Sequence, residues 1–298
     1  MARARQPPAG RRAFLKGMLG LGVGALTGTA AYGYAYERHR IGVTRADLAV
    51  SRVPPGLAGF RIALLTDVHR SETVDRPFVE RAVDLALDAA PDLVVLGGDF
   101  VSWADRRYMG DVAEAVGRLW APHGVFAVLG NHDDDRVMPA ALARNGVTVL
   151  RDARARLVVS GERLDLIGLR YWTRDPESLA RIARGAAPGT ILLAHDPRRL
   201  RAAAGLGIPL VLSGHTHGGQ VLVPGLGAIA ARKFPVVYGT GRDRDTVIFV
   251  SRGIGTVYVP VRFNCPPEVA VLTLRPYTTP AGPGRAGTGH DGSETRRS

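Results

Sequence analysis

The stretch IPLVLSGHTHGGQ, residues 208–220, passes within a few positions from an apolar run to two histidines among glycines. The same form recurs in four other segments, which are FRIALLTDVH (60–69), PDLVVLGGD (91–99), GVFAVLGNHDD (124–134) and GTILLAHD (189–196). Short continuous apolar runs rich in β-branched residues are typical of strands that are buried on both faces. Each segment therefore predicts a buried strand that ends in a cluster of polar side chains.

Helices are predicted in the first two gaps between these runs. Apolar residues recur there at helical spacing, namely Phe78, Ala82, Leu85, Ala86 and Ala89, then Met109, Val112, Val116 and Leu119. Strands that alternate with helices favour the α/β class, with a parallel core and right-handed connections. In open α/β sheets, functional residues gather at the carboxyl ends of the strands. All the polar clusters are expected at that edge.

The polar clusters predict a metal site. They contain five of the eight histidines of the chain, His69, His132, His195, His215 and His217. Neutral imidazole is the commonest side-chain metal ligand. In an extended segment, residues two apart point to the same side, so Asp67 would lie beside His69 and His215 beside His217. Glycines at 214, 218 and 219 would let the backbone turn beneath these ligands.

The blocks Asp67-x-His69, Gly98-Asp99, Gly130-Asn131-His132-Asp133, His195 and Gly214-His215-x-His217 together resemble the calcineurin-like metallophosphoesterases, in family order. The resemblance implies a four-layer αββα sandwich with two metal ions at one edge. Residues 251–274 extend it and resemble the bacterial exported phosphodiesterases grouped with UDP-diacylglucosamine hydrolases.

The resemblance also implies a role for each site residue. The first metal would be held by Asp67, His69 and His217, the second by Asn131, His195 and His215, and Asp99 would bridge both. His132 would be the catalytic residue, stabilising phosphoryl oxygens or protonating the leaving group. Two such cations can bind a phosphate and generate a bridging hydroxide for in-line attack on phosphorus. Nitrogen and oxygen ligands without sulfur suit Mn, Fe or Zn.

Several residues keep two interpretations. Ser102 and Trp103 stand where protein Ser/Thr phosphatases carry an aspartate and an arginine, which argues against that class and leaves the residue that orients His132 unidentified. Asp133 either orients the site or caps the segment after it, and we favour capping. Arg70 and Arg170 are either phosphate ligands or solvated loop residues. The single cysteine, Cys265, is expected to be a packed small apolar residue.

The N-terminus resembles a twin-arginine export signal. Arg11 and Arg12 precede Phe14, Leu15 and Lys16, and an uncharged apolar stretch continues to residue 36. We expect 1–36 to be a signal peptide or membrane anchor, 37–275 the metallophosphoesterase domain and 276–298 a disordered tail. The twin-arginine translocase would be a partner, and the protein would act on the extracytoplasmic side, in the envelope or secreted, with membrane association open.

The net charge of +12 is spread along the chain beyond the N-terminus, which suits an anionic substrate or envelope and predicts no specific nucleic acid. We expect an exported phosphoesterase of the phosphodiesterase or pyrophosphatase type, acting on an envelope lipid or a nucleotide-linked substrate. The alternatives are a nuclease and a non-catalytic metal-binding envelope protein; His132, which ligates no metal in this scheme, disfavours the second. Residues 218–241 are expected to form a hairpin and rim near the metals, and the sequence leaves open whether that rim admits a lipid or a nucleotide.

Overall fold

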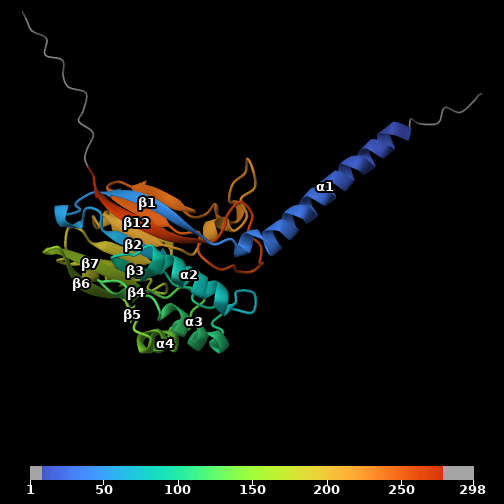
Figure 1. Cartoon of the computed structure of the whole chain (residues 1–298). Coiled ribbons are helices and arrows are strands. Elements are labelled where there is room, and N and C mark those ends of the chain that lie inside the picture. Colours follow the sequence, from blue (N-terminus) through green and yellow to red (C-terminus); the bar gives the residue numbers. More distant parts are fainter. Residues whose placement is uncertain (1–8, 278–298) are drawn as a thin grey trace, which may run out of the picture.

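Two six-stranded sheets form the body of the protein, in a computed structural model that describes residues 9–277 (Figure 1). The first sheet has the order β1-β12-β2-β3-β4-β5, formed by β1 (Gly42–Val50), β12 (Glu268–Pro276), β2 (Arg61–Leu65), β3 (Leu93–Leu96), β4 (Val125–Ala127) and β5 (Thr148–Val149). The second has the order β10-β11-β9-β8-β7-β6, formed by β10 (Gly239–Asp243), β11 (Thr246–Val250), β9 (Leu210–Ser213), β8 (Ile191–Ala194), β7 (Glu162–Leu169) and β6 (Ala153–Val159).

The predicted buried strands are the centres of these sheets. β2, β3 and β4 are parallel neighbours in the first sheet, and β8 and β9 are parallel neighbours in the second. The parallel prediction is therefore confirmed for these strands. Antiparallel pairs lie elsewhere, where β12 joins β2, β6 joins β7 and β10 joins β11.

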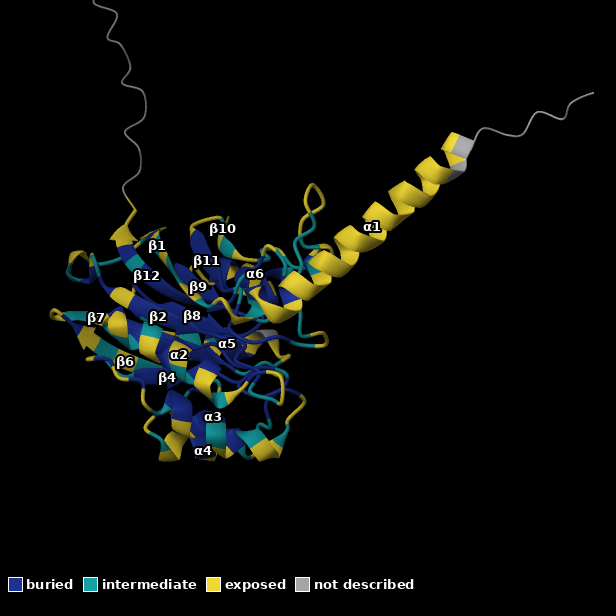
Figure 2. Ribbon diagram, turned by 45° about the vertical axis from the view of Figure 1, so that its right-hand side comes forward, coloured by how far each residue is buried: buried dark blue, intermediate teal, exposed yellow. Residues whose placement is uncertain are grey.

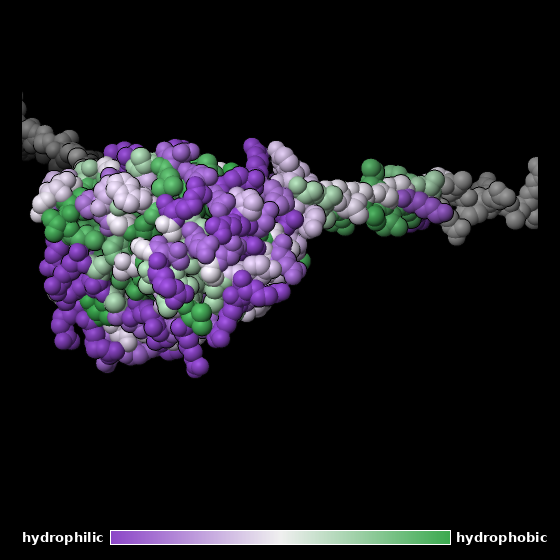
Figure 3. All heavy atoms as spheres, turned by 60° about the horizontal axis from the view of Figure 1, so that its bottom comes forward, coloured by the Kyte–Doolittle hydropathy of each residue, from purple (hydrophilic) through white to green (hydrophobic). Residues whose placement is uncertain are grey.

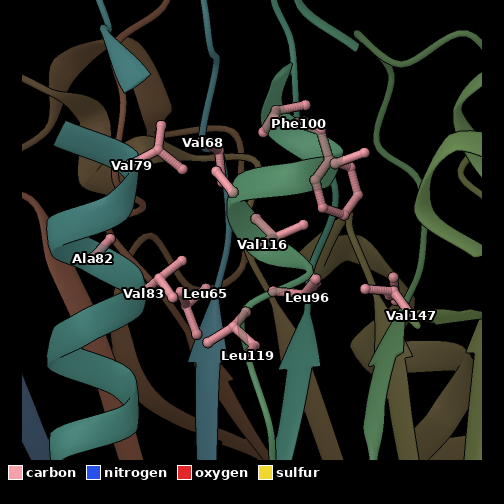
Figure 4. Packing of buried hydrophobic residues seen from close by; sticks show 14 of the residues in the cluster. Leu65, Val68, Val79, Ala82, Val83, Leu96, Phe100, Val116, Leu119 and Val147 are labelled. Carbon is pink, nitrogen blue, oxygen red and sulfur yellow. The ribbon is translucent and has the colours of Figure 1, made fainter. Parts of the chain in front are cut away.

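Helices cover the outer face of each sheet. On the first sheet they are α2 (Arg76–Asp88), α3 (Met109–Val116) and α4 (Met138–Arg144); on the second they are α5 (Pro176–Ala183) and α6 (Leu200–Gly205). Figure 4 shows Val83 of α2 packed toward Leu65 of β2, and Val79 of the same helix toward Val68. Leu119, which was predicted to belong to the second helix, follows the end of α3 and still packs in the same core.

A central core lies between the two sheets. Leu64, Val95, Leu193 and Leu212 are fully buried in it. Alternation along each strand sends one set of side chains into this layer and the other set toward the helices. The result is the expected four-layer αββα sandwich.

Helix α1 (Ala9–Ala35) projects from the domain and is exposed along most of its length (Figure 2). Green, apolar atoms are prominent on its projecting part in Figure 3. The span Ala13–His39 is long and apolar enough to cross a membrane, by length and composition. At the other end, β12 continues to Pro276, the first residue of the predicted tail, and 278–298 lie outside the described residues.

Candidate metal centre

The predicted ligand segments meet at the carboxyl ends of the central strands of both sheets. The segments follow β2, β3, β4, β8 and β9 directly. Backbone hydrogen bonds join neighbouring segments: Asp67 N–H donates to Gly98 O at 2.9 Å, and Gly214 N–H donates to His195 O at 3.1 Å. The sandwich therefore brings together residues that are up to 150 positions apart, because Asp67 and His217 occupy one site.

Two groups of ligand atoms share one carboxylate. The first group is Asp67, His69, Asp99 and His217, and the second is Asp99, His195 and His215; within each group the ligand atoms lie within 4.8 Å of one another. Asp99 Oδ2 is 3.4 Å from His69 Nε2 and 3.2 Å from His195 Nε2. Asp99 is thus the residue that belongs to both groups.

The donor atoms of these groups fit divalent cations. His69 Nε2 and His217 Nε2 face each other at 3.1 Å, as do His215 Nδ1 and His195 Nε2. His195 Nδ1 lies 2.7 Å from Gly97 O, which fixes the proton on Nδ1 and leaves the Nε2 lone pair directed into the site. Converging lone pairs repel one another unless a cation lies among them.

The side chain of Asn131 also offers an atom that could bind a cation. Its Oδ1 is buried and has no hydrogen-bond partner among the described residues. A buried amide oxygen without a partner is costly, and a hard or borderline cation would satisfy it. Asn131 lines the same cavity as His215.

The charges of the site also favour cation binding. Burial alone would raise the pKa of Asp99, but His195 and His69 hold it well below its ordinary value. At His195 burial alone would lower the pKa, but Asp99 and Asp67 outweigh it and raise the pKa to about 10, so a proton on Nε2 takes the place of a cation there until a metal ion displaces it. Burial and the charge of His195 lower the pKa of His215 to about 4. The buried carboxylates therefore attract positive charge, while His215 stays in the neutral form that ligates metals.

The backbone of the ligands is bent rather than extended. Asp67, His69, Asp99, His215 and His217 all have positive φ angles, between 49° and 74°. Asp67 and His69 do lie in one ligand group as expected, but strand alternation is not what brings them together, because β2 and β9 end before these residues. A left-handed backbone conformation costs free energy at a non-glycine residue. Residues in such conformations are concentrated at functional sites. The ligands converge because the chain turns out of each strand.

Gly214, directly before His215, allows its backbone to lie close to the carboxylate of Asp67. A Cβ on Gly214 would collide with Asp67 Oδ2 and would lie 2.7 Å from Thr66 Oγ1. Gly214 does not have a positive φ, so space and not backbone conformation requires glycine there. Gly218 and Gly219 do have positive φ angles, of 60° and 83°, and make the predicted turn after His217.

Asp133 orients the site, and the preferred capping interpretation is wrong. Its carboxylate accepts hydrogen bonds from the backbone N–H groups of Asp99, Phe100 and Gly130, at 2.8–2.9 Å. The neighbouring Asp134 accepts from Arg136 and Val137 N–H just before α4. Asp133 therefore joins the β3 loop to the β4 loop and fixes the backbone of Asp99.

The group that orients His132 is a backbone amide. Trp103 N–H donates to His132 Nδ1 at 3.3 Å, and the edge of the Trp103 ring lies against the imidazole with centroids 4.5 Å apart. An imidazole that accepts at Nδ1 carries its proton on Nε2 when neutral. Burial lowers the pKa of His132, which favours that neutral form. Ser102, the other unexpected residue, places its Oγ 3.1 Å from His69 Nδ1 and so orients a ligand.

The two candidate phosphate arginines are already ion-paired with carboxylates of the protein. Arg70 pairs with Asp111 and donates to Val74 O at 3.0 Å. Arg170 pairs with Asp135, which also binds Arg151 at 3.0 Å. These contacts favour structural roles, although neither arginine is the solvated loop residue of the alternative interpretation.

Sequence reasoning missed the contribution of Arg262. Its fully buried guanidinium donates to the carbonyl oxygens of Gly255, Arg252 and Cys265, at 2.6–3.0 Å. The segment that it holds lies behind the first ligand group, because Gly255 N–H donates to Asp67 O at 2.7 Å. No motif marks such a residue. Cys265 is buried beside it, as predicted, and burial raises the pKa of its thiol.

A cavity of about 580 Å³ opens beside the ligands. One part of its wall is formed by site residues, including Asp99, Asn131, His132, His215 and His217. Most of the remainder is apolar and comes from Val221, Val223, Ile229, Ala230, Ala231, Phe234, Val257, Tyr258 and Val259. Residues 219–234 of the segment thus form a rim beside the site, as predicted, whereas 239–241 belong to β10.

The fold and the buried Asp/His cluster define a metal-dependent phosphoester hydrolase, and the comparisons with known proteins agree. The calcineurin-like phosphoesterase family matches residues 60–219, and the chain belongs to this family. The uncharacterized metallophosphoesterase YkuE of Bacillus subtilis is 33% identical, over 89% of this chain and 97% of its own length. The phosphodiesterase YaeI of Escherichia coli is 30% identical, over 73% of this chain and 83% of its own.

A third relative has a name that refers to a membrane. It is the transmembrane protein with metallophosphoesterase domain of Danio rerio, which is 30% identical over 83% of this chain. The match spans 60% of that relative's length.

Proposed function

We propose that this protein is an exported phosphodiesterase or pyrophosphatase that uses two divalent metal ions. The observation that carries the proposal is the position of Asp99 Oδ2, within 3.4 Å of an imidazole nitrogen from each ligand group. One ion would be held by Asp67, His69 and His217, the other by Asn131, His195 and His215, and Asp99 would contact both. Mn, Fe and Zn all suit this donor set.

Bound there, the ions would neutralise phosphate charge and supply a nucleophilic hydroxide near neutral pH. The residues of the chain do the rest. His132 lines the cavity and carries a proton on Nε2, which it can donate to a phosphoryl oxygen or to the leaving-group oxygen. Trp103 N–H keeps that proton on Nε2. Asp133 holds the loop of Asp99 so that the carboxylate is positioned before substrate binds.

The cavity favours a substrate with an apolar part. Its wall beyond the site residues is mostly aliphatic and aromatic, and Lys233 is the cation on that side. A phosphoester linked to an envelope lipid would place its phosphate at the metals and its apolar part against Val223 and Ile229. A nucleotide-linked lipid precursor has the same two parts.

Export is proposed from the N-terminal segment. The pair Arg11-Arg12, in the first turn of α1, precedes the span Ala13–His39, which has enough length and hydropathy to cross a membrane. We propose that residues 1–36 act as a twin-arginine signal or anchor and that 37–275 form the catalytic domain on the extracytoplasmic face. The translocase would then be a partner during export.

The test is hydrolysis of bis(p-nitrophenyl) phosphate and p-nitrophenyl phosphate by the full chain in detergent. The protein is stripped with a chelator and then restored with Mn²⁺ or Zn²⁺. Asp99→Asn removes the shared carboxylate, while Asp84→Asn is a matched control because Asp84 is exposed and pairs with Arg118 on the helical face.

We expect metal-dependent turnover that prefers the diester, that Asp99→Asn abolishes and that Asp84→Asn keeps. Bound metal is counted in the same samples. One tightly bound ion per chain in the active protein would contradict the two-metal proposal. A preference for the monoester would contradict the phosphodiesterase assignment.

A further inference from the structure

Two loops beside the cavity form one continuous surface. Gln220 Nε2 donates to Val259 O at 3.1 Å, and Val257 N–H donates to Gln220 Oε1 at 2.7 Å. Leu222 N–H donates to Phe263 O at 2.8 Å. We call residues 221–230 and 257–260 the rim surface. Because these hydrogen bonds join its two parts, the rim surface is a single structural unit.

Helix α1 ends against residues 261–265, which directly follow the second part of the rim surface. Arg262 N–H donates to Gly33 O at 3.3 Å, and the ring of Tyr32 lies edge-on to Phe263 with centroids 6.4 Å apart. Just after the helix, Glu37 accepts hydrogen bonds from the backbone N–H groups of Asn264 and Cys265. Figure 1 shows α1 leaving the domain at the end where orange loops project. A membrane crossed by α1 would therefore lie against the rim surface.

The rim surface exposes large apolar side chains to solvent. The exposed fraction is 57% for Leu226, 49% for Ile229, 79% for Tyr258 and 57% for Val259. Contiguous exposed apolar residues mark an interaction site in a protein whose core is otherwise well buried. Tyr258 has an apolar ring with a polar hydroxyl, and Val259 beside it is aliphatic. A side chain with one apolar and one polar end suits the boundary between lipid and water.

The loops that form the rim surface carry no acidic residue of their own, although Glu72 and Asp105, beside Arg107, line the pocket next to residues 257–260. No aspartate or glutamate occurs in 218–241 or in 251–267, whereas Arg232 and Lys233 are exposed directly after the first loop. Basic residues beside an apolar surface bind anionic headgroups while the apolar side chains enter the acyl boundary.

We propose that the rim surface is a membrane-contact surface whose partner is an anionic lipid bilayer. Leu226, Ile229, Tyr258 and Val259 enter the headgroup region next to α1. Ile229, Tyr258 and Val259 also line the cavity, so the cavity opens at the bilayer surface. The proposal rests on the proposed role of α1 as a membrane anchor and does not depend on the proposed catalytic function.

The test attaches an environment-sensitive fluorophore to the rim surface of the full chain in vesicles. The native Cys265 is fully buried, so cysteines introduced by Leu226→Cys or Tyr258→Cys are the reactive ones. Val158→Cys is the matched control, because Val158 is 69% exposed and lies on β6, at the far edge of the second sheet. The vesicles contain phosphatidylglycerol and phosphatidylcholine, with or without nitroxide-labelled lipid.

We expect blue-shifted emission at positions 226 and 258, and quenching by nitroxide lipid at least about twofold stronger than at 158, because an inserted apolar surface reaches roughly 5–10 Å into the boundary. Quenching should weaken when phosphatidylcholine is the only lipid. Aqueous emission at 226 and 258 would overturn the proposal. A blue shift without lipid quenching would also overturn it, because a second copy or another protein would then cover the surface.

Discussion

The backbone N–H of Trp103 donates a hydrogen bond to Nδ1 of His132, and the two rings meet edge to face. A backbone amide can only donate, so it holds the histidine in the neutral tautomer with the proton on Nε2. An aspartate in this place would instead stabilise the charged imidazolium. The distinction matters because His132 is the proposed proton donor.

Replacement of His132 tests this role. We expect His132→Asn to lower kcat for a diester by about 10²–10⁴-fold, the usual contribution of a positioned proton donor. The loss should be larger for an alkyl leaving group than for p-nitrophenolate, which needs little protonation. Steady-state kinetics with both esters measures it, and metal content should equal that of the wild type. Equal losses for both leaving groups would contradict proton donation to the leaving group.

Two glycine substitutions separate crowding at the site from a general effect on stability. Gly214→Ala places a Cβ against Asp67 Oδ2, and we expect it to displace Asp67 and weaken metal binding. Gly110→Ala, in α3, meets nothing within 4 Å and should stabilise the protein by up to about 1 kcal/mol, as alanine does in helices. Metal titration and urea unfolding of both variants check this. Wild-type metal affinity in Gly214→Ala would show that the loop relaxes freely.

Removing the charge of Asp133 should loosen the loop of Asp99. An amide offers one oxygen in place of two, so Asp133→Asn leaves backbone donors of Asp99, Phe100 or Gly130 without an acceptor. We expect a loss of about 1–3 kcal/mol in the free energy of unfolding. Urea unfolding of the metal-free protein measures it. Asp84→Asn, which removes an exposed carboxylate that pairs with Arg118, is the control, and an equal loss in both variants would contradict a special role for Asp133.

A pH-dependent contribution to stability is expected from Asp165, away from the site. Burial alone would raise the pKa of Asp165, but Arg163 and the N–H of Ala187 outweigh it and hold the pKa below its ordinary value. The unfolded chain then binds a proton more readily than the folded one, so the ionised carboxylate stabilises the fold above about pH 3.9 and loses this effect as the pH falls. Asp165→Asn should be less stable than wild type at neutral pH.

Unfolding curves of both proteins across that range give the measurement. The difference in unfolding free energy should shrink as the pH falls through the lowered pKa. A difference that stays constant down to strongly acidic pH would show that hydrogen-bond geometry, and not charge, carries the effect.

The sequence by itself determined the strand-forming runs, the ligand residue types and the edge at which they gather. These properties are local, because each run carries its apolar residues and its ligands within about ten positions. The blocks around Asp67, Asp99, His132, His195 and His215 could therefore be recognised before any contact was known. Apolar spacing likewise located α2 and most of α3.

The tertiary structure alone decided which atoms meet. The packing of the two sheets brings Asp99 between His69 and His195, and long-range contacts set those distances. The donor to His132 is a backbone N–H, a group that every residue but proline carries, so no sequence signal marks it. The same holds for Asp133, whose acceptor role depends on where the loop of Asp99 passes. The type of each ligand side chain is therefore written in the sequence, whereas its orientation depends on contacts that form only when the two sheets pack together.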